Sequence, residues 1–443
     1  MYNYLIENGL ILSSQKTEKK TIGLLGEKIH LLEPGHEYEA EAKLDATGCY
    51  ILPGLVDPHV HPNYEDSLAQ TSISAVYGGV TTVLHYIPIK AGENPLEKIR
   101  QVQAEGETGS VIDFGLHAAF FDTANQLSAI KGLSQLGVRS FKMFTAYARS
   151  GWLTPDAVLL KALAEIASAE GLACVHAESG AAIEFLEERL SPLTVHNFLA
   201  TSPALLDKEA IWRTLCYAKI ANCPLYLPHI SSRKALEALA LAKEEGIPFY
   251  SETCPHYLAF SWEDLKSRGP QGKLRPPIKT AEDREALWNA LEDLTIHCIG
   301  SDHAPKAKLP NDDFHSAPFG APGVETILPV LWELGVNANH LTPFDLVRLC
   351  CENPAKIFGL FPRKGQLAEG SDADLIIFDP TQKWQLSQSQ QHSKAPYTLY
   401  EGLTCRGKIL KVFVRGRLVV DNDKLCCQGG GRFLRTEPGK WAL

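Results

Sequence analysis

Apolar segments of β-strand character alternate with longer segments of helical periodicity from about residue 54 to about residue 360. The segments 155–170 and 233–245 are of the helical kind. Such alternation predicts a parallel sheet covered by helices. Eight candidate strands end near His61, Ile87, Phe120, Tyr147, Glu178, Ile230, Thr253 and Asp302. Eight βα units predict an α/β fold, a closed (β/α)8 TIM-like barrel. An open doubly wound sheet is the alternative, but no GxGxxG turn follows the first strand.

The two ends of the chain have a different pattern. Short β-type segments at 4–12, 21–25 and 28–32 are separated by turn dipeptides, and similar segments recur at 374–378, 410–414 and 418–420. We therefore expect both ends to form one small β-sandwich domain. The expected limits are 1–53 for its first part, 54–362 for the barrel, and 363–443 for its second part and the C-terminal tail.

Charge and composition narrow the class of partner. A formal net charge of −9 over 443 residues disfavours nucleic acid or an anionic membrane surface. The first ten residues lack the basic and apolar parts of a secretion signal, and no apolar stretch is long enough to cross a bilayer. We therefore expect a cytoplasmic protein with no membrane partner. The 11 cysteines form no CxxC pair, so they are expected to be free thiols.

Ligand-type side chains fall at the ends of several predicted strands. His59 and His61 alternate on the first strand and therefore point to the same side. Four further strands each carry one such residue near the C-terminal end, namely Lys142, His176, His229 and Asp302. Any one of these histidines alone is more often a satisfied core residue, and Asp302 alone could cap a helix. Together they predict a metal site, because the C-terminal ends of barrel strands converge on one mouth.

Lys142 lies within the apolar segment 140–144. A lysine in such surroundings must lose its charge, find a partner or extend to solvent. A neutral lysine amine can add carbon dioxide and become a carbamate, which is a carboxylate-like group able to bridge two cations. The alternative is an ion pair between Lys142 and Asp302 or Glu178.

The order HxH, Lys, His, His, Asp carries a resemblance to a known family. Together with the segments 52–61 and 365–378, it resembles the cyclic amidohydrolases of the amidohydrolase superfamily, which include hydantoinases, dihydropyrimidinases, allantoinases and dihydroorotases. The resemblance implies a binuclear metal centre, usually of zinc. One metal would be held by His59, His61 and Asp302, the second by His176 and His229, and both would be bridged by carboxylated Lys142.

The same resemblance implies the reaction. Hydroxide shared by the two metals would attack the carbonyl carbon of a cyclic amide, and Asp302 would carry the proton from water to the leaving nitrogen. The segment 140–147 is most similar to hydantoinases and dihydropyrimidinases, in which a tyrosine after the bridging lysine donates to the developing oxyanion. Tyr147 stands at that position. Such a donor typically contributes roughly 3 kcal/mol of transition-state stabilisation.

Other positions decide between members of the group. Dihydroorotases carry an arginine two positions after HxH and a histidine after the DHAP motif, where this chain has Asn63 and Lys306. Dihydroorotate is therefore a weaker candidate, and an allantoinase-type activity is the main alternative. Arg275 stands where hydantoinases usually have serine, and Pro322 cannot donate a backbone N–H. Arg275 could hold an acidic substituent or point to solvent.

The expected substrate contacts are Tyr147, Asn63, Arg275 and Gly323. The expected partner is a small cyclic amide or ureide, and the family resemblance suggests a homodimer or homotetramer. Some relatives of dihydropyrimidinases are not enzymes and have lost their metal ligands. Since all six ligand positions are intact here, an enzyme is favoured over a non-enzymatic dihydropyrimidinase-like protein.

Overall fold

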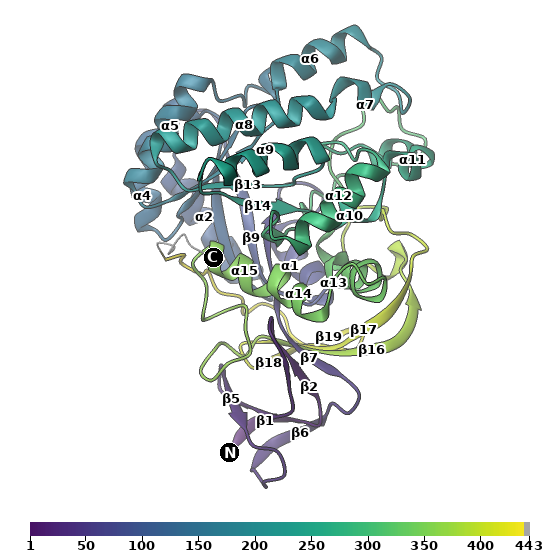
Figure 1. Ribbon diagram of the computed structural model, residues 1–443. Helices are drawn as coiled ribbons and strands as arrows, with labels where there is room; N and C mark the ends of the chain where they lie inside the picture. Colours follow the sequence, from purple (N-terminus) through teal and green to yellow (C-terminus); the bar gives the residue numbers. More distant parts are fainter. Residues whose placement is uncertain (438–443) are drawn as a thin grey trace.

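A computed structural model describes residues 1–437, and its centre is a barrel of eight parallel strands in sequential order (Figure 1). The strands are β8 (Leu55–Val60), β9 (Val80–Ile89), β10 (Asp113–Phe120), β11 (Ser140–Phe144), β12 (Leu172–His176), β13 (Leu225–Leu227), β14 (Tyr250–Thr253) and β15 (Cys298–Ile299). A bridge between Val60 and His303 joins the first strand to the segment after the last. Asp57 spans the same seam, because its Oδ1 accepts from the backbone N–H of His59 and of Ser301, both at 3.0 Å.

Helices surround this sheet. Those between and after the barrel strands are α1 (Leu68–Tyr77), α2 (Pro95–Gly109), α3 (Thr123–Gln126), α4 (Ile130–Gln135), α5 (Asp156–Ser168), α6 (Gly180–Arg189), α7 (Phe198–Thr201), α8 (Ala204–Ala221), α9 (Arg233–Glu244), α10 (Pro255–Ala259), α11 (Trp262–Leu265), α12 (Ala281–Glu292), α13 (Ile327–Leu331), α14 (Pro343–Val347) and α15 (Asn353–Ile357). None of the helices described is both long and apolar enough to span a membrane.

The sequence pattern explains these elements. Helix α9 buries Ala235, Ala238, Leu239 and Ala242, a spacing that places one face on the barrel, and its N-cap Ser232 accepts from the N–H of Ala235. Strand β8 is buried along its whole length, as expected for a parallel strand covered on both sides. Every predicted strand end lies within three residues of an observed one. The predicted barrel fold is confirmed.

Both chain ends contribute to the small β domain below the barrel in Figure 1. One sheet has the order β5-β4-β1-β6 and the other the order β19-β18-β17-β16-β7-β2-β3. Their bounds are β1 (Tyr2–Glu7), β2 (Leu10–Leu12), β3 (Thr17–Glu18), β4 (Thr21–Leu25), β5 (Lys28–Leu32), β6 (Ala40–Asp45), β7 (Tyr50–Pro53), β16 (Leu375–Gln385), β17 (Thr404–Val414), β18 (Arg417–Asp421) and β19 (Lys424–Leu425). The predicted sandwich of both ends is confirmed, and the domain limits remain a prediction.

Buried charges join the barrel floor to this domain. Lys364 Nζ donates to Asp113 Oδ2 at 2.6 Å and to Asp374 Oδ2 at 2.7 Å. Arg415 Nε donates to Asp113 Oδ1 at 3.0 Å. Asp113 begins strand β10, so this network stabilises the end of the barrel opposite the mouth. Each of these buried charges has a partner of opposite charge, as a buried ionic group requires.

Candidate metal centre

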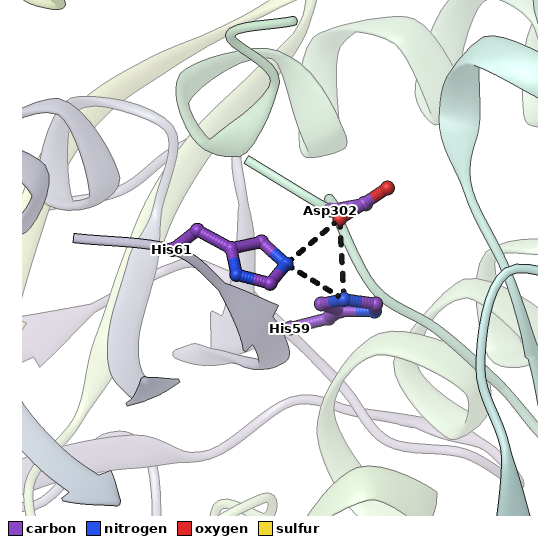
Figure 2. Close-up of side chains that lie close together, drawn as sticks. All are labelled: His59, His61 and Asp302. Atoms are coloured by element: carbon purple, nitrogen blue, oxygen red, sulfur yellow. Dashed lines mark hydrogen bonds and ion pairs between the residues drawn. The ribbon is translucent and has the colours of Figure 1, made fainter. Parts of the chain in front are cut away.

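Three predicted ligands meet at the barrel mouth (Figure 2). His59 Nε2 lies 3.2 Å from His61 Nε2 and 3.1 Å from Asp302 Oδ1, and His61 Nε2 lies 3.2 Å from the same oxygen. Two imidazoles and a carboxylate that converge in this way suit a divalent cation such as zinc. His59 extends from β8, whereas Asp302 follows β15, so the seam of the barrel builds this group.

Glu252 on β14 is a site residue that the sequence analysis did not identify. Its Oε1 lies 2.7 Å from His59 Nδ1 and accepts from the backbone N–H of His229 at 3.1 Å. Its Oε2 accepts from the Tyr226 hydroxyl at 2.5 Å. The carboxylate therefore fixes the ring of His59 with Nε2 toward the ligand cluster and ties that ring to a second predicted ligand. An acidic side chain within a predicted barrel strand was the available signal.

His176 and His229 form the second group. Their ring centroids lie 4.6 Å apart, and the rings of His229 and His59 lie 5.5 Å apart. His176 Nε2 faces Glu178 Oε2 at 2.7 Å, which leaves Nδ1 as the ring nitrogen available to a ligand. Glu178 was considered as a partner of Lys142, but it is the partner of His176. The two groups of predicted ligands are thus adjacent.

Lys142 is buried on β11 beside both groups. Its Nζ lies 4.7 Å from the ring centroid of Tyr86, and no carboxylate lies within ion-pair distance of it in residues 1–437. Burial lowers the pKa of the Lys142 amine, which favours its neutral form. The alternative of an ion pair with Asp302 or Glu178 is therefore not observed. A neutral, buried amine is the form that reacts with carbon dioxide.

Backbone conformation marks three of the predicted residues. Tyr147, His229 and Asp302 have φ values of 65°, 46° and 47°, in the left-handed region that residues with a side chain rarely adopt. Such conformations cost of order 1–3 kcal/mol each and concentrate at functional sites. Each of the three follows a barrel strand, where the turn aims its side chain toward the mouth.

Charge states follow from this burial. Burial lowers the pKa of His61 to about 4 and that of His229 well below its usual value, so both rings are neutral near pH 7 and free to bind a cation. Burial also opposes ionisation of Asp302, but the neighbouring His59 and His61 hold its pKa far below the usual range. Asp302 is therefore a carboxylate. Burial raises the pKa of Tyr147, which keeps its hydroxyl protonated as a donor.

His303 is held from both sides. Its Nδ1 accepts from the backbone N–H of Gly323 at 3.1 Å, so its Nε2 carries the proton and donates to Asp66 Oδ2 at 3.1 Å. Asp66 in turn accepts from the backbone N–H of Lys394 at 2.8 Å. Gly323, which was expected to contact substrate, thus directs its N–H to His303.

A cavity of about 790 Å³ opens above the ligand cluster. Its lining includes all six predicted metal ligands and three of the four expected substrate contacts, namely Tyr147, Asn63 and Arg275. Gly323 is outside this lining. Tyr147 lies against His176, with ring centroids 5.0 Å apart, so its hydroxyl-bearing ring borders the second ligand group.

Arg275 does not point to solvent. Its side chain is 5% exposed, stacks on the ring of Phe319 at 4.5 Å from the centroid, and donates through Nη2 to Glu187 Oε1 at 2.5 Å. The solvent-exposed alternative for this residue was therefore wrong. The sequence could not distinguish the two, because the partners lie 88 and 44 positions away along the chain.

Fold and site together define a (β/α)8 barrel with a histidine and carboxylate metal centre at the C-terminal ends of its strands. The chain belongs to the amidohydrolase family, whose sequence profile matches residues 50–419. The resemblance stated from the motifs is thereby confirmed, and a divalent metal centre follows from family membership and the His59, His61 and Asp302 cluster.

Several similar proteins match over nearly their whole length. A D-hydantoinase of Ralstonia pickettii is 32% identical over 457 residues, covering 98% of this chain and 99% of its own. The solved dihydropyrimidinase of Brevibacillus agri superposes with a TM-score of 0.94 at 29% identity, covering 98% of this chain and 99% of its own. The L-hydantoinase (dihydropyrimidinase) of Arthrobacter aurescens superposes with a TM-score of 0.92 at 30% identity, with the same coverage.

Proposed function

We propose that this protein hydrolyses a cyclic amide of the hydantoin or dihydropyrimidine type. The observation that carries the proposal is the convergence of the six ligand-type residues on one cavity, in a chain whose full-length relatives are named hydantoinases and dihydropyrimidinases. Water adds to the amide carbon, the ring C–N bond breaks, and the nitrogen leaves with a proton.

The residues fit a binuclear centre. His59, His61 and Asp302 would hold one divalent ion, and His176 and His229 a second. Nitrogen and oxygen donors of this kind suit zinc. Lys142, as a carbamate, would contribute to both, which its burial and the lack of a carboxylate partner in residues 1–437 support. Bound metal would polarise the amide carbonyl and lower the pKa of water.

Two side chains would handle the proton and the developing charge. Asp302, ionised and at the cluster, would accept a proton from the attacking water and deliver it to the leaving nitrogen. Tyr147 remains protonated and borders the cavity, so its hydroxyl would donate to the carbonyl oxygen as negative charge develops there.

A substrate panel tests the proposal. Metal-loaded protein is assayed with hydantoin, dihydrouracil, allantoin and dihydroorotate by loss of amide absorbance, with Asp302→Asn as the matched inactive control. We expect hydrolysis of hydantoin or dihydrouracil, with a metal content near two per chain. Turnover of allantoin alone would instead assign the allantoinase-type activity. No turnover of any ring, with less than one metal per chain, would overturn the enzyme assignment.

Location and assembly are further proposals that rest on the sequence. We propose a cytoplasmic homodimer or homotetramer. Cell fractionation and light scattering of the purified protein test the two statements, and a monomer at assay concentration would contradict the second.

A further inference from the structure

The cavity is larger than a bare ring requires. At about 790 Å³ it lies toward the upper part of the roughly 300–1,000 Å³ range of ligand pockets. Besides the six predicted ligands, its lining includes the residues Arg149, Glu187, Arg275 and Phe319. We call these four residues the arginine wall. A ring held at the metal centre therefore has room for a substituent.

Arg275 is the member of this wall with unused hydrogen-bonding capacity. One nitrogen, Nη2, donates to Glu187, and the guanidinium plane rests on Phe319. Its Nε has no acceptor among residues 1–437, although the side chain is 5% exposed. When a charged group is buried, leaving one of its N–H donors without an acceptor costs free energy. Such donors are therefore normally satisfied by protein, water or ligand.

The two arginines of the arginine wall differ in how their charges are paired. Glu187, 15% exposed, is shared between Arg275 at 2.5 Å and Arg149 Nη1 at 3.3 Å. Glu188 also contacts Arg149 at 2.9 Å, but it is 72% exposed and is screened by solvent. Arg149 is itself 47% exposed and also lies 4.0 Å from Glu184, whereas the buried Arg275 has only Glu187 as an ion-pair partner among residues 1–437.

Lysine and arginine side chains outnumber the carboxylates of the lining, which are Glu187, Glu188 and Asp302. Lys306 Nζ lies 4.2 Å above the ring of Tyr64, and in residues 1–437 no carboxylate lies within ion-pair distance of it. Lys273 lines the cavity as well, with its Nζ donating to three backbone carbonyls. A cationic lining in a chain of net charge −9 attracts anions into the cavity.

We infer that the arginine wall is a subsite for a negatively charged substituent, and that the preferred substrate is a cyclic amide carrying a carboxylate. Arg275 is the specificity-determining residue of this subsite, and its planar guanidinium, stacked on Phe319, presents a fixed donor to the carboxylate. The inference rests on the proposed function and names the substrate class of the same site.

Matched pairs of substrates test it. Carboxymethyl-hydantoin is compared with carbamoylmethyl-hydantoin, and dihydroorotate with its primary amide, so that each pair differs only in charge. We expect kcat/KM to favour the carboxylate member of at least one pair by roughly tenfold or more, the effect of one hydrogen bond to a charged group. In Arg275→Gln this ratio should fall below about threefold, and Arg275→Lys should restore part of it.

Two further variants complete the design. Glu187→Gln removes the compensating charge and should raise the carboxylate preference. Arg213→Gln removes an arginine that pairs with Asp156 and Glu209 outside the cavity, and should leave the ratio as in the wild type. If circular dichroism shows that Arg275→Gln does not fold, the Glu187→Gln variant decides whether the subsite exists. A raised carboxylate preference in that variant supports the subsite, and an unchanged or lowered preference overturns it.

The outcomes separate the two levels of the proposal. Hydrolysis of the rings with no carboxylate preference in the wild type would overturn the subsite and leave the proposed function standing. If no ring is hydrolysed, calorimetric binding of the same pairs is measured. Tighter binding of a carboxylate member that depends on Arg275 would keep the subsite and reject the proposed reaction, and equal binding would reject both.

Discussion

Replacing Glu252 by glutamine is expected to weaken both halves of the metal centre at once. Glu252 Oε1 lies 2.7 Å from His59 Nδ1 and 3.1 Å from the backbone nitrogen of His229, so one carboxylate oxygen orients a ligand of each group. Glutamine has nearly the same volume and can keep its carbonyl oxygen toward these donors. The change therefore removes charge with little change in packing.

The expected magnitude follows from these two contacts. A hydrogen bond to a charged group contributes about 1.5–3 kcal/mol and a neutral one about 1 kcal/mol, so each contact loses about 1 kcal/mol. Two contacts give about 2 kcal/mol, or roughly 30-fold in affinity. This value lies within the roughly 10–100-fold range typical of residues that orient metal ligands.

Chelator competition with the metal-free protein measures this effect, with metal content determined for both sites. Glu263→Gln serves as the matched control, because Glu263 is 76% exposed and pairs with Lys266 at the surface. Glu252→Gln should bind both metals more weakly while its thermal unfolding in the absence of metal stays close to that of the control. Metal affinity within threefold of the wild type would refute the orienting role of Glu252.

Three other substitutions test separate parts of the site. Lys142→Ala should lower activity more than about 100-fold and reduce metal content, with partial recovery in short carboxylic acids; full activity would contradict a bridging role. Tyr147→Phe should lower kcat by about 10²–10³-fold with little change in KM, and an unchanged kcat would remove Tyr147 from the oxyanion site. Gly300→Ala should reduce metal content without touching a metal, because its Cβ would lie 2.5 Å from Glu252 Oε2 and 2.9 Å from His59 Cβ; normal metal content would show that this contact relaxes.

The barrel and the ligands could be predicted because both depend on local pattern. A strand of apolar residues that ends in a histidine or an aspartate can be recognised from a short stretch of sequence. The barrel fold itself then brings the ends of such strands together. His176 at the end of β12 was found in this way, and Lys142 was found as a charged residue within the apolar segment of β11. The identity of the loops that connect the strands was not needed.

Residues whose roles depend on distant partners could not be predicted. Glu252 meets His59, which lies 193 positions earlier, through closure of the barrel rather than through any motif. Arg275 depends on a loop that packs against Glu187 and Phe319. Gly323 was expected to contact substrate, but its N–H donates to His303. Barrel closure decided the case of Glu252 and loop conformation the other two, and loops carry little periodic signal.

The order of strands in the seven-stranded sheet has a consequence for biosynthesis. Strand β7 lies between β2 and β16, and β16 begins at Leu375, more than 300 residues later. During translation the edge of β7 is therefore without its neighbour while the entire barrel emerges from the ribosome, and unpaired edges of this kind promote aggregation. The last strands to be made thus complete a sheet that begins with β2, and a nascent chain is expected to depend on chaperones until these strands are synthesised.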